Sequence, residues 1–213
     1  LGTFTKTGAG TLILTGANTF TSQMIVNAGV LNVRNNTALG TEPLGTAANN
    51  TAPVSTTVSN GATLQLQDDI HIGSEELVIS GAGADGQNGA LVNVSGNNTI
   101  GRNFAVSNMA ILLSGNSVFS SDSGSFTTFL ALNTCGADGM ASTAPAWTLT
   151  LTGAGNGNFG TLLNSTSTGI NSIGGLIKNG TGTWTIYRRD NGFSGGVTLN
   201  SGVLAVGGLG NGG

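Results

Sequence analysis

The chain has 213 residues, of which 37 are glycine, 7% are charged and 5% are aromatic, and its net charge is −3. The excess of acidic over basic residues leaves no basic footprint for nucleic acid, and no apolar run reaches the roughly 18 to 20 residues of a membrane-spanning helix. A single cysteine, Cys135, excludes an internal disulfide, and together with a single histidine it argues against a zinc site, so we expect no metal and no cofactor.

One sequence phrase recurs along the whole chain: a glycine-containing turn followed by apolar residues that alternate with Thr, Asn or Gln. The alternation places Leu12 and Leu14, for example, on one buried face of a short strand. In chain order, such strands are expected at 10–14, 29–33, 61–66, 89–94, 147–151, 182–186 and 202–206. Their irregular spacing of about 20 to 30 residues is typical of solenoid coils.

A β-sandwich would also contain short alternating strands. The scarcity of aromatic residues and the glycine-rich turns favour a solenoid, in which small aliphatic side chains and Asn or Thr ladders stack from coil to coil. We therefore expect an all-β fold, a parallel β-helix, as a single segment over residues 1–213. Two stretches rich in Ala, Asn, Thr and Pro, 35–53 and 134–145, are interpreted as loop excursions from its wall.

The two ends of the chain match each other. Residues 4–14 align with 176–186, which places Lys6 on Lys178 at a spacing of 172 residues. After one inserted residue the match resumes, and 26–31 align with 199–204. Two repeat units, at about 3–33 and 175–206, therefore bracket a more divergent middle.

These units resemble the passenger-associated repeat of autotransporter proteins, whose pattern runs approximately L-x-K-x-G-x-G-T-L-x-L-x-G-x-N-T-Y-x-G-G-T-x-V-x-x-G-x-L. The first unit fits at Lys6, Gly8, Gly10, Thr11, Leu12, Leu14, Gly16, Asn18, Thr19, Val26, Gly29 and Leu31. The second fits at Lys178, Gly180, Gly182, Thr183, Ile186, Phe193, Gly195, Gly196, Gly202 and Leu204. Ser22 and Gln23 depart from a glycine pair, and Trp184 replaces the first leucine.

The resemblance covers about a third of the chain. It implies a right-handed, single-stranded parallel β-helix that is exported through or displayed on a bacterial envelope, and it implies no catalytic residues. An extracellular or cell-surface location follows from it as an expectation. The lysine of each unit is expected to be a solvated charge or one that blunts a sheet edge.

Parallel β-helices also include enzymes that cleave polysaccharides, so a carbohydrate-active enzyme is an alternative. Such sites need carboxylates held close together, and the weak candidates are Asp69 and His71, which would share a strand face while Asp68 points the other way. A solvated acidic loop over 68–76 is the simpler interpretation. The Gly-rich segments 81–89 and 136–139 resemble single copies of a calcium-binding repeat, which needs consecutive copies, and are interpreted as ordinary turns.

Another segment combines aromatic and charged side chains within a few residues: Trp184, Tyr187, Arg188 and Arg189. Exposed aromatic residues beside arginine are typical of interfaces, so these residues are candidates for a contact with sugar or protein. The alternative is a surface turn whose side chains have no binding role, with Trp184 filling the interior of a wide coil.

The sequence therefore predicts a structural or adhesive extracellular β-solenoid, with cell-surface or matrix glycans and proteins as candidate partners. Solenoids need polar caps at their ends, and neither end of this sequence has the pattern of one. We expect either continuation in a longer chain or end-to-end self-association, so that a self-assembling filament subunit is the second functional alternative.

Overall fold

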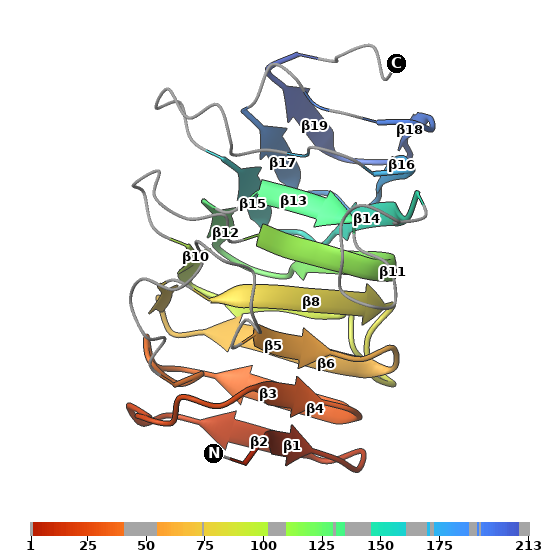
Figure 1. Cartoon of the computed structure of the whole chain (residues 1–213). Coiled ribbons are helices and arrows are strands. Elements are labelled where there is room, and N and C mark those ends of the chain that lie inside the picture. Colours follow the sequence, from red (N-terminus) through yellow and green to blue (C-terminus); the bar gives the residue numbers. More distant parts are fainter. Residues whose placement is uncertain are drawn as a thin grey trace.

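The computed structural model describes residues 2–40, 55–73, 75–101, 110–129, 131–134, 146–160, 170, 173–187, 191 and 193–208. Over these residues the chain forms short strands and no helix. Every strand pair is parallel. The strands lie across the long axis of the molecule, and the sequence climbs from β1 at one end to β19 at the other (Figure 1). This arrangement confirms the all-β, parallel stack predicted from the sequence, whereas the right-handed winding stays a prediction.

The strands form three columns, of which the second follows the whole length of the stack, while the strands of the first end at β13 and those of the third begin at β7. The first column contains β1 (Phe4–Lys6), β3 (Met24–Val26), β5 (Ser55–Val58), β8 (Glu76–Gly81), the first half of β11 (Ala110–Ser121) and β13 (Ala131–Thr134). The second contains β2 (Thr11–Leu14), β4 (Gly29–Val33), β6 (Ala62–Gln67), β9 (Leu91–Ser95), the second half of β11, β14 (Thr148–Thr152), β16 (Gly175–Lys178) and β18 (Val197–Leu199).

The third column is a separate sheet of β7 (His71–Ile72), β10 (Asn97–Ile100), β12 (Ser125–Thr128), β15 (Asn156–Phe159), β17 (Thr183–Ile186) and β19 (Val203–Val206). The long strand β11 pairs with β8 through Ile111 and with β9 through Phe119, which joins the first two columns into one 13-stranded sheet. All seven strands expected from the sequence are present, and their bounds differ from the expected ones by at most two residues.

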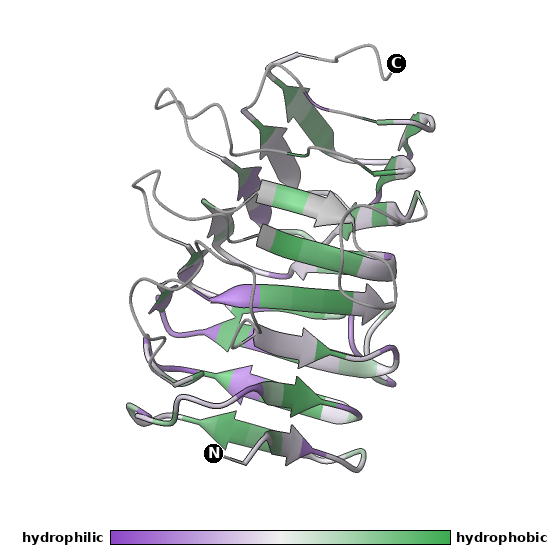
Figure 2. Ribbon diagram, viewed as in Figure 1, coloured by the Kyte–Doolittle hydropathy of each residue, from purple (hydrophilic) through white to green (hydrophobic). Residues whose placement is uncertain are grey.

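The interior consists of side chains that repeat in register from coil to coil. One ladder in the second column runs through Leu12, Leu31, Leu64, Leu91, Phe119, Leu151, Lys178 and Leu199. Leu149 and Leu151 of β14 are completely buried, while the threonines beside them are half-buried, which confirms the predicted alternation. Burying each such leucine contributes about 1.5–3 kcal/mol, and Figure 2 shows apolar strand residues at every level of the stack.

Aromatic side chains also fill part of the tube, which corrects the expectation of an aliphatic interior. Phe119, Phe126, Phe159 and Trp184 are all at most 1% exposed. The rings of Phe159 and Trp184 stack with their centroids 5.6 Å apart, and Phe119 stacks on Phe159 at 6.4 Å. Four large rings at neighbouring levels therefore form one contiguous packed cluster in the upper half of the stack.

The two predicted loop excursions are described only in part. Residues 41–53 and 135–145 lie outside the described residues, and so does Cys135. Within the first excursion, Ala38 and Leu39 are buried and belong to the hydrophobic core. Ala38 and Leu39 therefore pack within the wall, and Thr134 belongs to β13.

Candidate functional site

The lysine of the first repeat lies at the corner between β1 and β2. Lys6 is 7% exposed, and its Nζ donates hydrogen bonds to the carbonyl oxygens of Gly8 at 2.8 Å and Ala28 at 2.8 Å. Gly8 belongs to the same coil, whereas Ala28 belongs to the corner of the next coil. The ammonium group therefore ties two successive corners together.

The lysine of the second repeat repeats this arrangement. Lys178 is completely buried, and its Nζ donates to the carbonyl oxygens of Asn179 at 2.5 Å, Gly180 at 2.9 Å and Ser201 at 3.2 Å. Burial lowers the pKa of Lys178, because removal from water disfavours the charged form. The prediction of a solvated or edge-blunting lysine is wrong for both repeats: a long stem reaches inward to backbone acceptors that only the folded corner assembles.

Glycine is required where these corners stack. Gly29 has a φ of +68°, and a Cβ there would lie 2.5 Å from the carbonyl oxygens of both Gly8 and Gly10. Gly202 repeats this geometry at φ +70°, with the oxygens of Gly180 and Gly182 at 2.5 and 2.6 Å. Any side chain would separate the coils, since these oxygens belong to rigid backbone.

The two lysine corners occupy different edges of the tube. The first lies between the first and second columns, because β1 and β2 belong to those columns. The second lies between the second and third columns, where β16 and β17 belong. The first repeat therefore places its strands and corner on the first and second columns, whereas the second repeat places the same unit on the second and third columns.

Trp184 does not lie on the surface. It is completely buried, its ring lies over Gly157 of the preceding coil, and its Nε1 donates to the carbonyl oxygen of Thr152 at 3.1 Å. The prediction that Trp184 contributes to a surface contact is therefore wrong, and the alternative, a tryptophan that fills a wide coil, is correct. Tyr187 is half-buried, while Arg188 and Arg189 lie outside the described residues.

Asp69 and His71 do not share a strand face as expected. Asp68 and Asp69 form the corner before β7 with positive φ values of 75° and 56°, a conformation that aspartate tolerates better than most residues. The carboxylate of Asp69 accepts a hydrogen bond from the backbone N–H of Asn97 at 2.7 Å, and His71 contacts the hydroxyl of Thr99. Both side chains thus connect to the next coil, and a catalytic role for them stays a prediction that no contact here supports.

The acidic segment is not uniformly solvated. Asp68, Asp69 and His71 are exposed, but Glu75 is 5% exposed and accepts a hydrogen bond from the Thr56 hydroxyl at 2.6 Å. Sequence reasoning missed this buried carboxylate, because its partner lies on β5, a strand without apolar alternation. The expectation of a solvated loop is therefore wrong at Glu75.

A buried amide network occupies the corner between β9 and β10. The side chain of Asn98 accepts from the backbone N–H of Ile70 at 2.8 Å and donates to the carbonyl oxygen of Ser95 at 2.8 Å. Asn93 donates to the carbonyl oxygen of Ser123 at 2.8 Å, and both asparagines are completely buried. Three successive coils are joined through these two side chains.

Short polar side chains cover the outer face of the six-stranded sheet. One column contains, in register, His71, Thr99, Thr127, Asn158 and Thr185. Within it the Asn158 amide donates to the Thr127 hydroxyl at 3.2 Å. A parallel column contains Asn97 and Ser125, which are hydrogen-bonded at 2.8 Å, followed by Asn156. This face, the polar ladder, presents hydroxyl and amide groups at a regular repeat.

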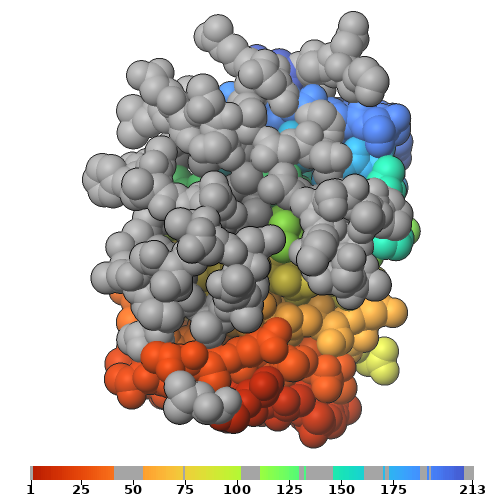
Figure 3. Space-filling view, in the orientation of Figure 1, coloured from red at the N-terminus to blue at the C-terminus, as the bar shows by residue number. Residues whose placement is uncertain are grey.

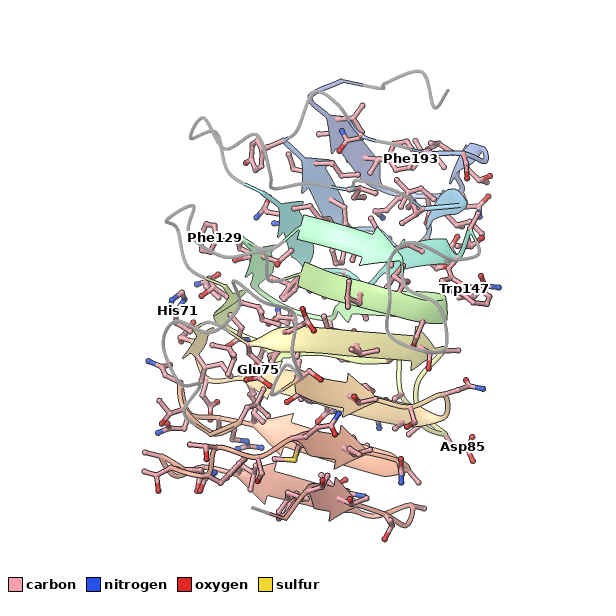
Figure 4. The ribbon with its side chains drawn as sticks, viewed as in Figure 1. His71, Glu75, Asp85, Phe129, Trp147 and Phe193 are labelled. Atoms are coloured by element: carbon pink, nitrogen blue, oxygen red, sulfur yellow. The ribbon has the colours of Figure 1, made fainter. Side chains whose placement is uncertain are left out.

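The glycine-rich turn at 81–89 lies at another edge of the tube. Figure 4 shows Asp85 of this turn and His71 at opposite sides of the molecule. Within the described ranges, no three His, Cys, Asp or Glu side chains come together in a geometry suited to a metal ion. The segment 136–139 lies outside those ranges.

Comparisons with known proteins agree with the repeat structure. The family model of the passenger-associated-transport-repeat matches the chain twice, at residues 4–33 and 176–206. No curated protein and no solved structure matches the chain. In the described part of the chain no helix has the length and apolar character needed to cross a membrane. Each matched segment contains one lysine corner with the strands before and after it, and the chain therefore contains two copies of the passenger-associated-transport repeat found in autotransporter passengers.

Proposed function

We propose that this chain is a structural segment of an exported passenger, a β-helical tube that gives length and rigidity to a protein displayed on, or released from, a bacterial surface. The observation that carries the proposal is the unbroken ladder from Leu12 to Leu199, in which each coil is the template for the next. Coils stacked in this way make a stiff rod without disulfides, because each interface buries apolar surface and satisfies backbone groups.

The low charge supports the same role. Where an ordinary surface carries Lys and Glu, this tube presents hydroxyl and amide groups that hydrogen-bond to one another along the stack. Such bonds are insensitive to salt, unlike surface ion pairs. A tube of this composition suits an environment whose ionic strength is not controlled by a cell.

A display assay tests the proposal. The chain is placed between a secretion signal and an outer-membrane translocator, and protease accessibility is measured on intact cells. We expect the wild-type tube to reach the surface as a protease-resistant body. Leu151→Asp puts a charge in the buried ladder and should give a degraded or retained product, whereas Thr150→Asp, which faces outward from the same strand, should behave as the wild type.

Two results would contradict this function: retention of the wild type inside the cell, or cleavage of the wild type as fast as Leu151→Asp. A fluorescent reporter fused to the same translocator without the tube separates a failure of the tube from a failure of export.

We further propose that contacts with glycans or proteins of neighbouring surfaces are made by the polar ladder. Its support is the register of Thr99, Thr127 and Asn158, which repeats donors and acceptors along one face. A glycan array probed with the wild type and with Thr127→Ala/Asn158→Ala tests it, and binding that is equal for both proteins would exclude this face.

A further inference from the structure

Each lysine corner places three backbone carbonyl oxygens around one amine. At Lys178 these oxygens lie 2.5, 2.9 and 3.2 Å from Nζ and belong to Asn179, Gly180 and Ser201. Because an ammonium group has three N–H donors and no acceptor, each of its protons has one carbonyl oxygen to bind. This set of oxygens, the carbonyl cradle, therefore has the number and polarity of ligands that one ammonium group requires.

The first repeat contains a second carbonyl cradle. Nζ of Lys6 lies 2.8 Å from the carbonyl oxygens of both Gly8 and Ala28, and 3.4 Å from that of Thr7. In both repeats two of the oxygens come from the lysine's own corner and the third comes from the corner of the next coil. In Figure 3 the coils of the first repeat, in red and orange, and those of the second, in blue, lie at opposite ends of the molecule. The cradle therefore arises twice, in different surroundings.

The cradle at Lys178 is held by backbone hydrogen bonds that do not involve the amine. The N–H of Asn179 donates to the carbonyl oxygen of Leu151 at 2.7 Å, which ties the corner to the preceding coil. The N–H of Asn200 donates to the backbone carbonyl oxygen of Lys178 at 2.9 Å, which ties it to the next coil. The carbonyl oxygens should therefore keep their places when the amine is removed.

The oxygens of the cradle suit a weakly hydrated monovalent cation better than a divalent one. They are uncharged, and among the described residues no carboxylate lies within ion-pair distance of either amine. Calcium takes about six to eight oxygen ligands at about 2.3–2.6 Å, and magnesium requires about 2.0–2.1 Å. Five of the six cradle oxygens lie 2.8–3.4 Å from the amine nitrogen. Backbone carbonyl oxygens of this kind can replace the hydration shell of potassium, and ammonium is similar to potassium in size.

A corner without lysine has a neutral donor in the equivalent role. The Asn93 amide donates to the carbonyl oxygens of Ser123 at 2.8 Å and Gly96 at 3.4 Å, and to the hydroxyl of Ser121 at 3.1 Å. This amide also links its own corner to that of the next coil, but only two carbonyl oxygens converge on it, which matches its two N–H groups. The positive charge is therefore found where a third carbonyl oxygen joins the set.

We propose that the carbonyl cradle is a binding site for a monovalent cation, either a primary ammonium ion or potassium, and that the lysine side chain is its tethered ligand. In the wild type the stem and the amine of the lysine fill the site. Removal of the amine should convert the corner into a site for a free ion of the same class. The repeat thus supplies its corners with a cation without depending on ions of the medium. The cradle is a property of the corner alone and does not rest on the proposed function.

Chemical complementation of Lys178→Ala in the full 213-residue chain tests the proposal. This substitution removes a group equal in size to propylammonium. We expect the melting temperature of the variant to fall, and then to rise saturably by a few degrees with propylammonium chloride at neutral pH, because a ligand that binds only the folded state stabilises it. Propanol, which has no charge, and tetramethylammonium, which has no N–H donor, should have no such effect.

Leu151→Ala is the matched control. Leu151 is completely buried and lies opposite Lys178 in the register of β14 and β16, and its truncation leaves a cavity without the carbonyl cradle. Propylammonium should leave the melting temperatures of this variant and of the wild type unchanged. An equal rise in Leu151→Ala, or no rise in Lys178→Ala, would overturn the proposal.

Lys178→Met tests the cation selectivity, and it replaces Lys178→Ala if that variant loses its β-sheet circular dichroism. Methionine fills the stem as far as Cε and leaves the position of Nζ vacant. Ammonium and potassium chloride should raise its melting temperature more than sodium or calcium chloride at equal ionic strength, and a crystal soaked in rubidium should show an anomalous peak at the former amine. A larger effect of calcium than of potassium, or the absence of the peak, would overturn the proposal. Because neither measurement involves display, the outcome is independent of the proposed function.

Discussion

The buried lysines are the residues in which this fold departs most from simple patterning. Lys6 and Lys178 each place a charged amine among backbone carbonyl oxygens, where an ordinary solenoid corner would leave those oxygens to water. The arrangement satisfies acceptors at two levels of the stack, but it removes the amine from water. The balance between these two effects depends on pH, because the charged form bears the loss of hydration.

Lys178 is predicted to make the stability of the tube rise with pH in the alkaline range. Burial lowers its pKa in the folded chain below its ordinary value of 10.5. Between the two values the unfolded chain holds a proton that the folded chain has released, so the unfolding free energy increases with pH. Urea unfolding at a series of pH values should show that the unfolding free energy of the wild type rises relative to that of Lys178→Met across this pH range. A difference in unfolding free energy that is independent of pH would contradict the prediction.

Asn98 is predicted to contribute to stability through its backbone partner on another coil. Asn98→Ala leaves the buried N–H of Ile70 without its acceptor, which costs about 1–3 kcal/mol. Asn97→Ala, on the exposed face of the same strand, should change the unfolding free energy by less than about 0.5 kcal/mol. Chemical denaturation of the two variants tests the difference, and equal effects would argue against the network.

At the scale of elements, each coil is shaped by the coil before it. The clearest case is β15 and β17, where Gly157 lies under the ring of Trp184. Trp184 corresponds to Leu12 of the first repeat. The larger side chain of the second repeat is therefore accommodated by a glycine, which has no side chain, in the coil below. Volume is thus shared between adjacent strands of a column.

Gly157→Ala is predicted to destabilise the tube by overpacking. The new methyl group would lie 2.2 Å from Cε3 of Trp184, and forced repacking costs about 1–3 kcal/mol. Trp184→Leu creates room, so the double variant should lose less stability than the sum of the single variants. Thermal unfolding of all four proteins gives the coupling energy, and strictly additive effects would show that the two residues do not compete for space.

The sequence predicted those strands in which glycine turns and apolar alternation coincide. It missed other strands, such as β5, where Thr56 takes an inward position beside Val58 and Ser55 and Thr57 lie on the opposite face, so polar residues occupy both faces and the apolar alternation disappears. It placed the lysines wrongly and left Trp184 undecided between the surface and the interior, since their partners come from other coils, at sequence separations that local patterns do not reach. The polar corner at Asp68 and Asp69 was misjudged because a positive φ is not visible in strand periodicity.

At the scale of the whole molecule, stability is distributed along one dimension. Each coil contacts only its neighbours, so a central coil has two interfaces and a terminal coil has one. The exposure of β18 and β19, compared with the burial of β6 and β9, follows directly from this difference.

Hydrogen exchange should reveal this gradient. In the isolated 213-residue chain, amides of β1, β2, β18 and β19 should exchange first and those of β6, β9 and β11 last, because the coils at the two ends can open without disrupting the rest. The measurement is mass spectrometry of peptic peptides after timed labelling. Uniform protection along the stack would instead indicate a single cooperative unit.

The parallel stacking of coils also determines how the tube responds to force. Its inter-strand hydrogen bonds lie along the long axis, and β1 and β19 lie at opposite ends of that axis (Figure 1). Tension applied between these ends therefore loads the last coil alone, and the coils detach one after another from that end. A coil of about 25 residues releases roughly 80 Å of extended chain, so a pulled tube would lengthen in discrete steps while its remaining coils stay intact.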